Sequence, residues 1–478
     1  MDDTVSRLDR VLNPRTVAVI GDKRAMGYMW LRSMSAFKGK LYSVQIDPNE
    51  LPGIQELGVP NYASLLDVPD DIDYAVCAVP RAVAPRIVRD CAAKGVGGVS
   101  LFTSGFAETG EDEGIRLQNE IAQVARESGL VLIGPNCMGV YNRRLGVRQA
   151  MDQPVGGEGC VGFISHSGTH AINFSLLASV HGVKVSKSIS AGNSVVVNPA
   201  DYLEYLAQDG ETRVIAMYLE GIQEPRRFFN LLKETTKKKP VVVWKGGVSE
   251  SGERAMFSHT AALATPLSVW QALVKQCGVI PTESLDETVD VVKALLFTKP
   301  CWGKRMGLVA LTGGQSVVIS DTFAREGLDV PLLTQRSYDE LSSFFNIIGG
   351  SYRNPLDAGG TLGFGARPDN LERMLRILDE DDNIDAVVLE IASRLLLRRA
   401  FGPLAPPADW LPDMLVAQAE RSPKAFIAIL HPGHLEAQVI EERTKLLERG
   451  VPVFGSFQQG ARALRRAIDY HRFCRGLD

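Results

Sequence analysis

The stretch Thr16-Val-Ala-Val-Ile20, which runs into Gly21-Asp22-Lys23, decides the fold class. An unbroken run of apolar and β-branched residues predicts a strand buried on both faces, and the glycine ends it in a turn. Similar runs follow at 41–46, 73–79, 97–102 and 130–133, with helical stretches such as 84–94 and 111–127 between them. Regular alternation of strands and helices predicts α/β structure, with a parallel, doubly wound sheet in a first domain of residues 1–145.

Small and polar residues gather where these strands end. Pro80 follows the third strand, Thr103-Ser104-Gly105 the fourth and Gly134-Pro135-Asn136-Cys137 the fifth. Open α/β sheets bind ligands at the carboxyl ends of their strands, so these turns are candidates for a binding site. The first turn, at Gly21 and Lys23, lacks a full GxGxxG and is a weak phosphate-loop signal. Its glycine could equally serve only to make a tight turn.

Length and composition exclude several classes of protein. The 478 residues suggest roughly three domains. A net charge of −4 without a basic stripe argues against a nucleic-acid partner. The seven cysteines are scattered without a CxxC pair, so neither a disulfide framework nor a metal site is expected. No apolar run approaches the ~20 residues of a membrane span, and the charged N-terminus is no signal peptide, so we expect a cytoplasmic protein.

The remaining sequence repeats one plan twice, in domains expected at 150–297 and 302–478. The segment 162–172, GFISHSGTHAI, aligns with 307–317, GLVALTGGQSV, and Glu220 aligns with Glu390. The interval from Gly247 to Gly278 is 31 positions, whereas the matching interval from Gly433 to Gly450 is 17. A segment present in only one copy is functional rather than architectural, because the fold closes without it. We therefore expect SESGERAMFSHTAALA, 249–264, to be a mobile loop that presents His259 before a helix begins. The alternative for this stretch is a surface loop with one solvated histidine.

The motifs VAVIGD, VQIDP, CAVP, TSGFAETG and GPNCMGVYN, in this order, resemble the CoA-binding domain of the NDP-forming acyl-CoA synthetases, the family that includes succinyl-CoA synthetase. The resemblance implies a Rossmann-like CoA-binding domain followed by two flavodoxin-like domains. It also implies phosphates at the first turn and the helix start after it. The residues that it assigns to CoA are Gly21, Lys23, Pro80, Ser104, Gly105, Phe106, Asn136 and Cys137.

Asp22 departs from this pattern, since the family usually has a small residue or serine there. A carboxylate beside a phosphate is repulsive unless it points away, although Lys23 and Arg24 would compensate.

In the second domain, SHT around His259 resembles the family's phosphohistidine motif, and Glu220 matches the glutamate that orients the phosphorylated ring. The resemblance assigns phosphate or acyl-phosphate binding to the turn Ser167-Gly168-Thr169 and to Asn193. A surface or capping role is the alternative for Glu220. His166 and His170 are unusual in this turn and are either substrate contacts or partly exposed capping residues.

The resemblance implies the alpha-type subunit of an ADP-forming acyl-CoA synthetase, which makes acyl-CoA from a small carboxylic acid, CoA and ATP through acyl phosphate and phosphohistidine. No GxxxxGK[ST] loop or ATP-grasp domain is found in the sequence. ATP/ADP with Mg is therefore expected on a separate ATP-grasp beta-type subunit, within an oligomer. Two alternatives stay open. The chain could be a CoA or acyl-CoA binding module without ligase chemistry, or a CoA-dependent lyase or transferase on the same scaffold.

Overall fold

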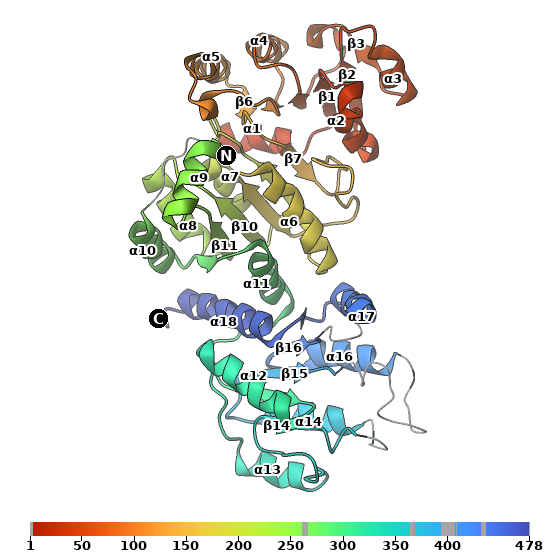
Figure 1. Ribbon diagram of the computed structural model, residues 1–478, viewed down its shortest axis with the longest axis vertical. Coiled ribbons are helices and arrows are strands. Elements are labelled where there is room, and N and C mark those ends of the chain that lie inside the picture. The colour runs from red at the N-terminus through yellow and green to blue at the C-terminus, as the bar shows by residue number, and fades with distance from the viewer. Residues whose placement is uncertain are drawn as a thin grey trace. The chain divides into compact units, whose positions relative to one another are not determined.

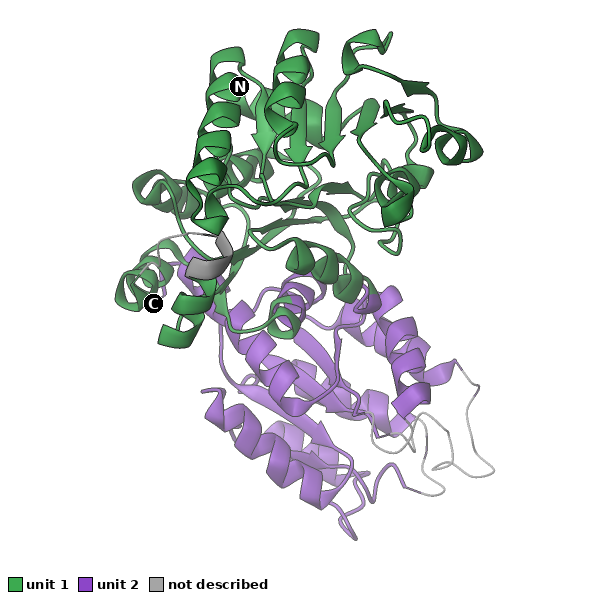
Figure 2. Cartoon of the chain, turned by 45° about the horizontal axis from the view of Figure 1, so that its top comes forward, with its two compact units in different colours: residues 1–179, 183–288 green, residues 180–182, 289–478 purple. Residues whose placement is uncertain are grey.

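The computed structural model describes residues 3–260, 266–363, 367, 369–392, 407, 409–431 and 436–477. Strands and helices alternate along the described chain (Figure 1). It divides into two compact units, one of residues 1–179 and 183–288 and the other of residues 180–182 and 289–478 (Figure 2). The first unit carries two sheets and the second carries one.

The first sheet has six parallel strands in the order β3-β2-β1-β4-β5-β6, which is the order of dinucleotide-binding Rossmann folds. Alternate residues of β1 face opposite sides: Val17 and Val19 belong to one apolar cluster, and Ala18 and Ile20 to another. Helices on both faces explain why the strand is apolar throughout. The strands are β1 Thr16–Ile20, β2 Lys40–Val44, β3 Asn61–Tyr62, β4 Tyr74–Cys77, β5 Gly98–Leu101 and β6 Val131–Ile133. The helices include α1 Asp3–Leu12, α2 Met29–Ser33, α3 Leu51–Glu56, α4 Ala84–Lys94 and α5 Asp112–Ser128.

The second sheet has the order β12-β11-β10-β8-β9-β7. Its five parallel strands follow the flavodoxin-like order. The sixth, β7, lies antiparallel to β9, with Gly139 opposite Ser190 and Asn142 opposite Lys187. The strands are β7 Gly139–Asn142, β8 Val161–Ser165, β9 Val185–Ser190, β10 Val214–Leu219, β11 Val241–Lys245 and β12 Ile280–Thr282. The helices are α6 Gly168–Val180, α7 Pro199–Gln208, α8 Pro225–Thr235, α9 Glu250–Thr260, α10 Leu267–Cys277 and α11 Leu285–Phe297.

The third sheet repeats the flavodoxin-like order with five parallel strands, β14-β13-β15-β16-β17. The duplicated plan expected from the sequence is therefore present in the topology. Glu390 ends β15 as Glu220 follows β10, and both are buried. The strands are β13 Met306–Ala310, β14 Leu356–Asp357, β15 Ala386–Glu390, β16 Ala425–Ile429 and β17 Val453–Phe454. The helices include α12 Gly313–Arg325, α13 Gln335–Ser342, α14 Asp369–Glu380, α16 Trp410–Arg421, α17 Glu436–Glu448 and α18 Phe457–Cys474.

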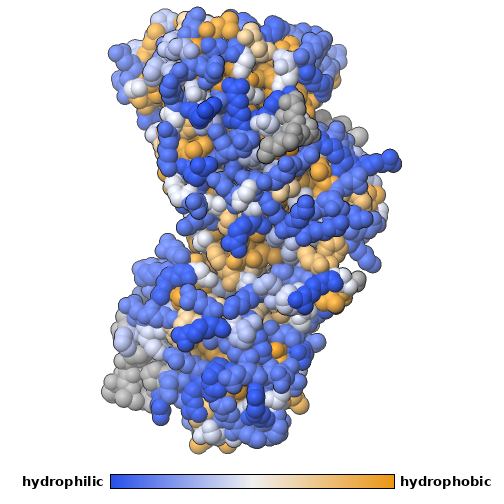
Figure 3. Space-filling view, turned by 180° about the vertical axis from the view of Figure 1, so that it is seen from behind, coloured by the Kyte–Doolittle hydropathy of each residue, from blue (hydrophilic) through white to orange (hydrophobic). Residues whose placement is uncertain are grey.

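Hydrophilic side chains cover most of the face drawn in Figure 3. None of the helices that the structure describes combines the length and the apolarity that crossing a bilayer requires.

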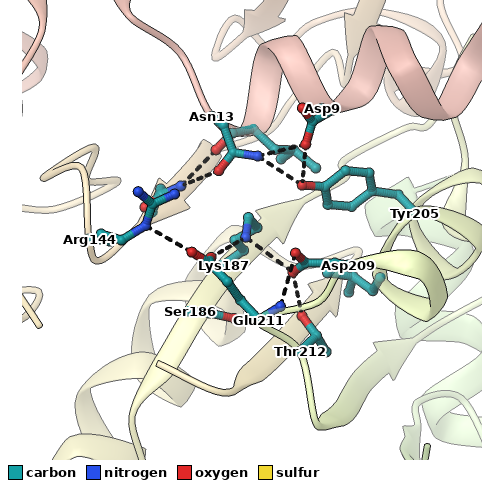
Figure 4. A network of polar contacts seen from close by, with 12 residues as sticks. Asp9, Asn13, Arg144, Ser186, Lys187, Tyr205, Asp209, Glu211 and Thr212 are labelled. Atoms are coloured by element: carbon teal, nitrogen blue, oxygen red, sulfur yellow. Dashed lines mark hydrogen bonds and ion pairs between the residues drawn. The ribbon is translucent and has the colours of Figure 1, made fainter. Parts of the chain in front are cut away.

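A polar network ties the two sheets of the first unit together (Figure 4). The hydroxyl of Tyr205, on α7, donates to Asp9 of α1 at 3.0 Å and accepts from Asn13 Nδ2 at 3.0 Å. Below it, the Lys187 ammonium, only 1% exposed, lies 3.1 Å from an Asp209 carboxylate oxygen and 2.6 Å from one of Glu211. A buried charge is tolerated when it is paired in this way. The network fixes the first domain on the second.

Candidate active site

The turn after β1 is tight because Gly21 has φ +80°, and a Cβ there would lie 2.6 Å from Val79 Cγ1. Asp22, which follows, is 3% exposed. Its carboxylate accepts hydrogen bonds from the backbone N–H groups of Trp30 at 3.0 Å and Leu31 at 2.9 Å, and from Lys23 at 3.0 Å. Burial raises the pKa of Asp22, against the effect of these bonds. The carboxylate is therefore turned into the first turn of α2 and already occupies the amide groups that the sequence assigned to phosphate.

The second turn, after β5, is built around Glu108. The Glu108 carboxylate accepts from the backbone N–H of Gly105 at 2.6 Å and of Phe106 at 3.1 Å. Arg81 Nη1 donates to the Gly105 carbonyl at 2.8 Å. The Phe106 side chain is 0% exposed and packs in the core, whereas Ser104 is exposed. Phe106 thus contributes only backbone to this edge.

The third turn follows β6. Asn136 has φ +59°, a left-handed conformation that asparagine tolerates. Cys137 is 3% exposed, and its thiol donates to the carbonyls of Leu101 and Ile133 at 3.5 Å each. Burial raises the pKa of Cys137 to about 12, so this thiol stays protonated at neutral pH and is no nucleophile. Pro80, after β4, is exposed.

The carboxyl edges of the two sheets meet at Gly192 and Asn193, which follow β9. A Cβ on Gly192 would lie 2.2 Å from the Pro135 carbonyl oxygen, so only glycine allows this approach. The Asn193 N–H donates to the same carbonyl at 3.0 Å. Asn193 Nδ2 donates to Glu108 Oε2 at 2.7 Å and to Gln118 Oε1 at 3.1 Å. The amide donors of Asn193 thus bind residues of the first domain, and they join the two strand edges at this point.

The turn from β8 into α6 lies at the carboxyl edge of the second sheet. Ser165 Oγ donates to the Ser167 carbonyl at 2.7 Å and accepts from the Ser167 N–H at 3.1 Å, which shapes the turn. A Cβ on Gly168 would lie 2.6 Å from Met138 Cγ, so the helix start rests against the first domain's last turn. Ser167 and Gly168 are half-buried and Thr169 is exposed.

Three strand ends of the second sheet converge on the Glu220 peptide. The Glu220 N–H donates to His166 Nδ1 at 3.1 Å, and Lys245 Nζ donates to the Glu220 carbonyl at 2.7 Å. All three residues are buried, at 5%, 6% and 6% exposure. Burial lowers the pKa of His166 to about 4, and it also lowers the pKa of Lys245. A clamped backbone on both sides of its Cα fixes where the Glu220 side chain starts.

Three rings pack beside this cluster. The His170, Tyr218 and Trp244 rings have centroids 4.5–4.6 Å apart, pair by pair. Burial, and then the Glu220 carboxylate, raises the pKa of Tyr218. The phenol therefore stays protonated next to Glu220.

His259 lies in α9, Glu250–Thr260, and its side chain is outside the described residues, as are 261–265. The expected loop is a helix instead from Glu250 onward. Ser249 Oγ accepts from the Gly252 N–H at 3.1 Å, an N-cap that starts it. Helix α9 packs against Ala107–Thr109, the short helix η4 that contains Glu108. Helix α9, which bears His259, therefore lies beside the turn after β5, one of the turns that the sequence predicts to bind CoA. Among the described residues no group of three His, Cys, Asp or Glu could hold a metal ion.

Comparison with known proteins agrees with this geometry. The family model described as "CoA binding domain" matches residues 15–143, and the one described as "Succinyl-CoA ligase like flavodoxin domain" matches 158–295. The alpha subunit of acetate–CoA ligase [ADP-forming] II from Pyrococcus furiosus is 33% identical over 453 residues, which are 94% of this chain and 94% of that subunit. The chain belongs to the ADP-forming acyl-CoA ligase family.

Two further members of the family are also similar to this chain. Acetate–CoA ligase [ADP-forming] I of Archaeoglobus fulgidus is 33% identical over 80% of this chain, which spans only 54% of that ligase. A solved structure described as Ca. Korarchaeum cryptofilum dinucleotide forming acetyl-coenzyme A synthetase 1, in complex with phosphate and ADP, superposes with a TM-score of 0.84 at 26% identity. It covers 98% of both chains. The Rossmann-like and flavodoxin-like fold class expected from the sequence is confirmed.

Two residues of the candidate site were not predicted from the sequence. Glu108 was only part of a motif, yet it joins the turn after β5 to Asn193. Lys245 has no part in the sequence prediction, yet its ammonium donates to the Glu220 carbonyl. A lone charged residue at a buried strand end, next to glycines, is the signal that could have found Lys245.

Proposed function

We propose that this chain is the alpha-type subunit of an ADP-forming acyl-CoA ligase, which converts a small carboxylate, CoA and ATP into acyl-CoA, ADP and phosphate. The observation that carries the proposal is the junction of the two strand edges through Asn193, Gly192 and Pro135, with α9 packed against η4. A CoA bound along the first edge would have its thiol beside the Glu220 cluster. We also infer that the enzyme works in the cytoplasm, where ATP and CoA are available.

In the proposed reaction His259 carries the phosphoryl group. Its imidazole takes the terminal phosphoryl group of ATP and releases ADP, and then passes the group to the carboxylate oxygen to give acyl phosphate. The CoA sulfur attacks the acyl carbon, the bond from that carbon to the phosphate oxygen breaks, and phosphate leaves with the thiol proton. Glu220 would hold the phosphorylated ring, because a carboxylate on one ring nitrogen stabilises a cationic imidazole.

The nucleotide would be supplied by a second polypeptide. We propose an ATP-grasp beta-type subunit that binds ATP/ADP with Mg, assembled with this chain in an oligomer. The Pyrococcus furiosus relative is itself named a subunit alpha, which supports the proposal. The purified chain alone should then form no acyl-CoA from carboxylate, CoA and ATP. Robust ATP-dependent synthesis by this chain alone would contradict the two-subunit proposal.

Phosphate labelling tests the histidine. The chain is incubated with labelled ATP and the partner, or with labelled acetyl phosphate, and the label should be acid-labile and base-stable. His259→Ala should abolish labelling and leave the heat of CoA binding unchanged. His431→Gln, at the corresponding strand end of the third sheet, is the matched control and should label like the wild type. Label that persists in His259→Ala would mean that another residue carries the phosphoryl group, and CoA binding without any label would favour a CoA-binding module.

A further inference from the structure

The His166 ring has a fixed tautomer. Its Nδ1 accepts the Glu220 N–H at 3.1 Å, and a nitrogen that accepts a hydrogen bond carries no proton. The single proton of the neutral ring is therefore on Nε2. The charged groups that act on the ring are Glu220 and Lys245, and burial lowers the pKa of His166 to about 4. At neutral pH His166 is an uncharged N–H donor whose orientation a backbone group holds.

This donor lies where acyl transfer is proposed. His166 is the residue between β8 and the Ser167-Gly168 start of α6, on the edge that also carries Glu220. The hydrogen bond from the Glu220 N–H uses Nδ1, so it leaves the Nε2–H to donate to another acceptor. The corresponding position of the third domain is Leu311, whose backbone N–H instead donates to the Glu390 side chain at 2.9 Å. The donor is thus absent from the copy that lacks the His259 segment.

Acyl transfer is accelerated by a hydrogen-bond donor at the carbonyl oxygen, and a neutral N–H can fill this role. When the CoA sulfur bonds to the acyl carbon, the carbonyl oxygen gains a negative charge, and it loses this charge as the bond to phosphate breaks. A preorganised N–H aimed at that oxygen stabilises the transition state more than the ground state, and one such donor is worth roughly 10²–10³ in rate.

We propose that His166 Nε2–H donates to the acyl carbonyl oxygen while the acyl group moves from phosphate to CoA. The inference rests on the proposed function and deepens it by assigning the oxyanion donor. It makes His166 a catalytic residue and Glu220, through its backbone N–H, a positioning residue for His166.

The test uses the half-reaction that needs no nucleotide. The full chain is mixed with CoA and acetyl, propionyl or benzoyl phosphate, and thioester and phosphate are measured. His166→Leu should lower kcat about 10²–10³-fold, with little change in the KM for CoA. His166→Gln should recover most of the rate, because its amide can accept from the Glu220 N–H and still donate. His471→Leu is the matched control, since His471 Nδ1 also accepts a backbone N–H, that of Cys301 at 3.3 Å, and its kcat should be that of the wild type.

Several results would overturn the assignment. An equal loss of kcat in the Leu and Gln variants would mean that His166 has only a structural role. An unchanged kcat in His166→Leu would show that His166 takes no part in the reaction. If His166→Leu does not fold, ¹⁵N spectra of the wild type decide, because a proton on Nδ1 at pH 7 contradicts the proposed donor. Labelling of His259 without thioester from any of the three acyl phosphates would refute the inference alone. Failure of both labelling and thioester formation would refute the proposed function.

Discussion

Replacing Asp22 with alanine should destabilise the first unit. It should leave the electrostatic environment of bound CoA unchanged. The substitution removes the acceptor of the Trp30 and Leu31 N–H groups from a site that is 3% exposed. Hydrogen bonds to charged groups contribute about 1.5–3 kcal/mol each and a helix cap about 1 kcal/mol. The carboxylate itself is disfavoured by burial, which raises its pKa, so the net loss should be less than the sum, about 2–4 kcal/mol. For a unit of this size that lowers the thermal midpoint by about 4–8 °C.

Asp22→Asn separates the acceptor from the charge. Its Oδ1 can still accept from Trp30 and Leu31, so its midpoint should fall by less than about 2 °C. Calorimetric scans and CoA titrations of the wild type and the two variants provide the measurements. Since the carboxylate faces α2, Asp22→Asn should bind CoA within about threefold of the wild type, which is below 1 kcal/mol. A wild-type midpoint for Asp22→Ala would refute the cap, and a tenfold gain in CoA affinity for Asp22→Asn would show that the carboxylate does repel the phosphates.

Three further outcomes are expected. Glu220→Gln should lower kcat of the complete ligase by roughly 10–100-fold, because the transition state loses one charge-assisted hydrogen bond. An unchanged kcat would show that Glu220 takes no part in the reaction. Gly192→Ala should lower the thermal midpoint, because its Cβ would lie 2.2 Å from the Pro135 carbonyl oxygen. Gly210→Ala, with open space around its Cβ, is the control and should not. Equal midpoints of the two variants would contradict the tight junction at Gly192. Acidification should destabilise the fold between pH 6.5 and about 4 through His166. The pKa of His166 is 6.5 in the unfolded chain and about 4 in the folded protein, so the unfolded state binds more protons between these values. The free energy of unfolding, measured by thermal scans, therefore rises with pH across this window by up to ~3 kcal/mol. His166→Gln should reduce that slope without abolishing it, because burial also lowers the pKa of His181, to about 3. An unchanged slope in the variant would contradict the buried neutral ring of His166.

The sheets were predictable from the sequence because buried parallel strands are continuous apolar runs. Strand β1, Thr16–Ile20, has the expected bounds. Glycine, proline and asparagine at the strand ends located the edge that carries the candidate site. The repeated sequence plan also predicted that the second and third sheets share one strand order.

What the sequence could not provide depends on contacts between distant residues. The side chain of Asp22 looked repulsive to phosphate until its partners on α2 were known. Phe106 and Cys137 stand in binding motifs, but whether a residue offers its side chain or its backbone is decided by the strand pleat and the packing around it. Helix α9 was missed because Gly252 and three serines suggested a loop, although Ser249, Glu250 and Glu253 together form a helix start.

Strand β7 has a consequence for anyone who wishes to cut the protein into parts. It follows the last CoA-like turn in the chain, yet all its ladder partners belong to β9 of the neighbouring sheet. A fragment that begins after residue 145 would lose this strand and expose the row of N–H and C=O groups along β9. Bare strand edges recruit other chains, so such a fragment should self-associate or exchange strands between copies. A fragment that ends at 145 would carry β7 as an unpaired C-terminal strand that is prone to pair with other chains. A second domain that is to be separable must therefore start before Gly139.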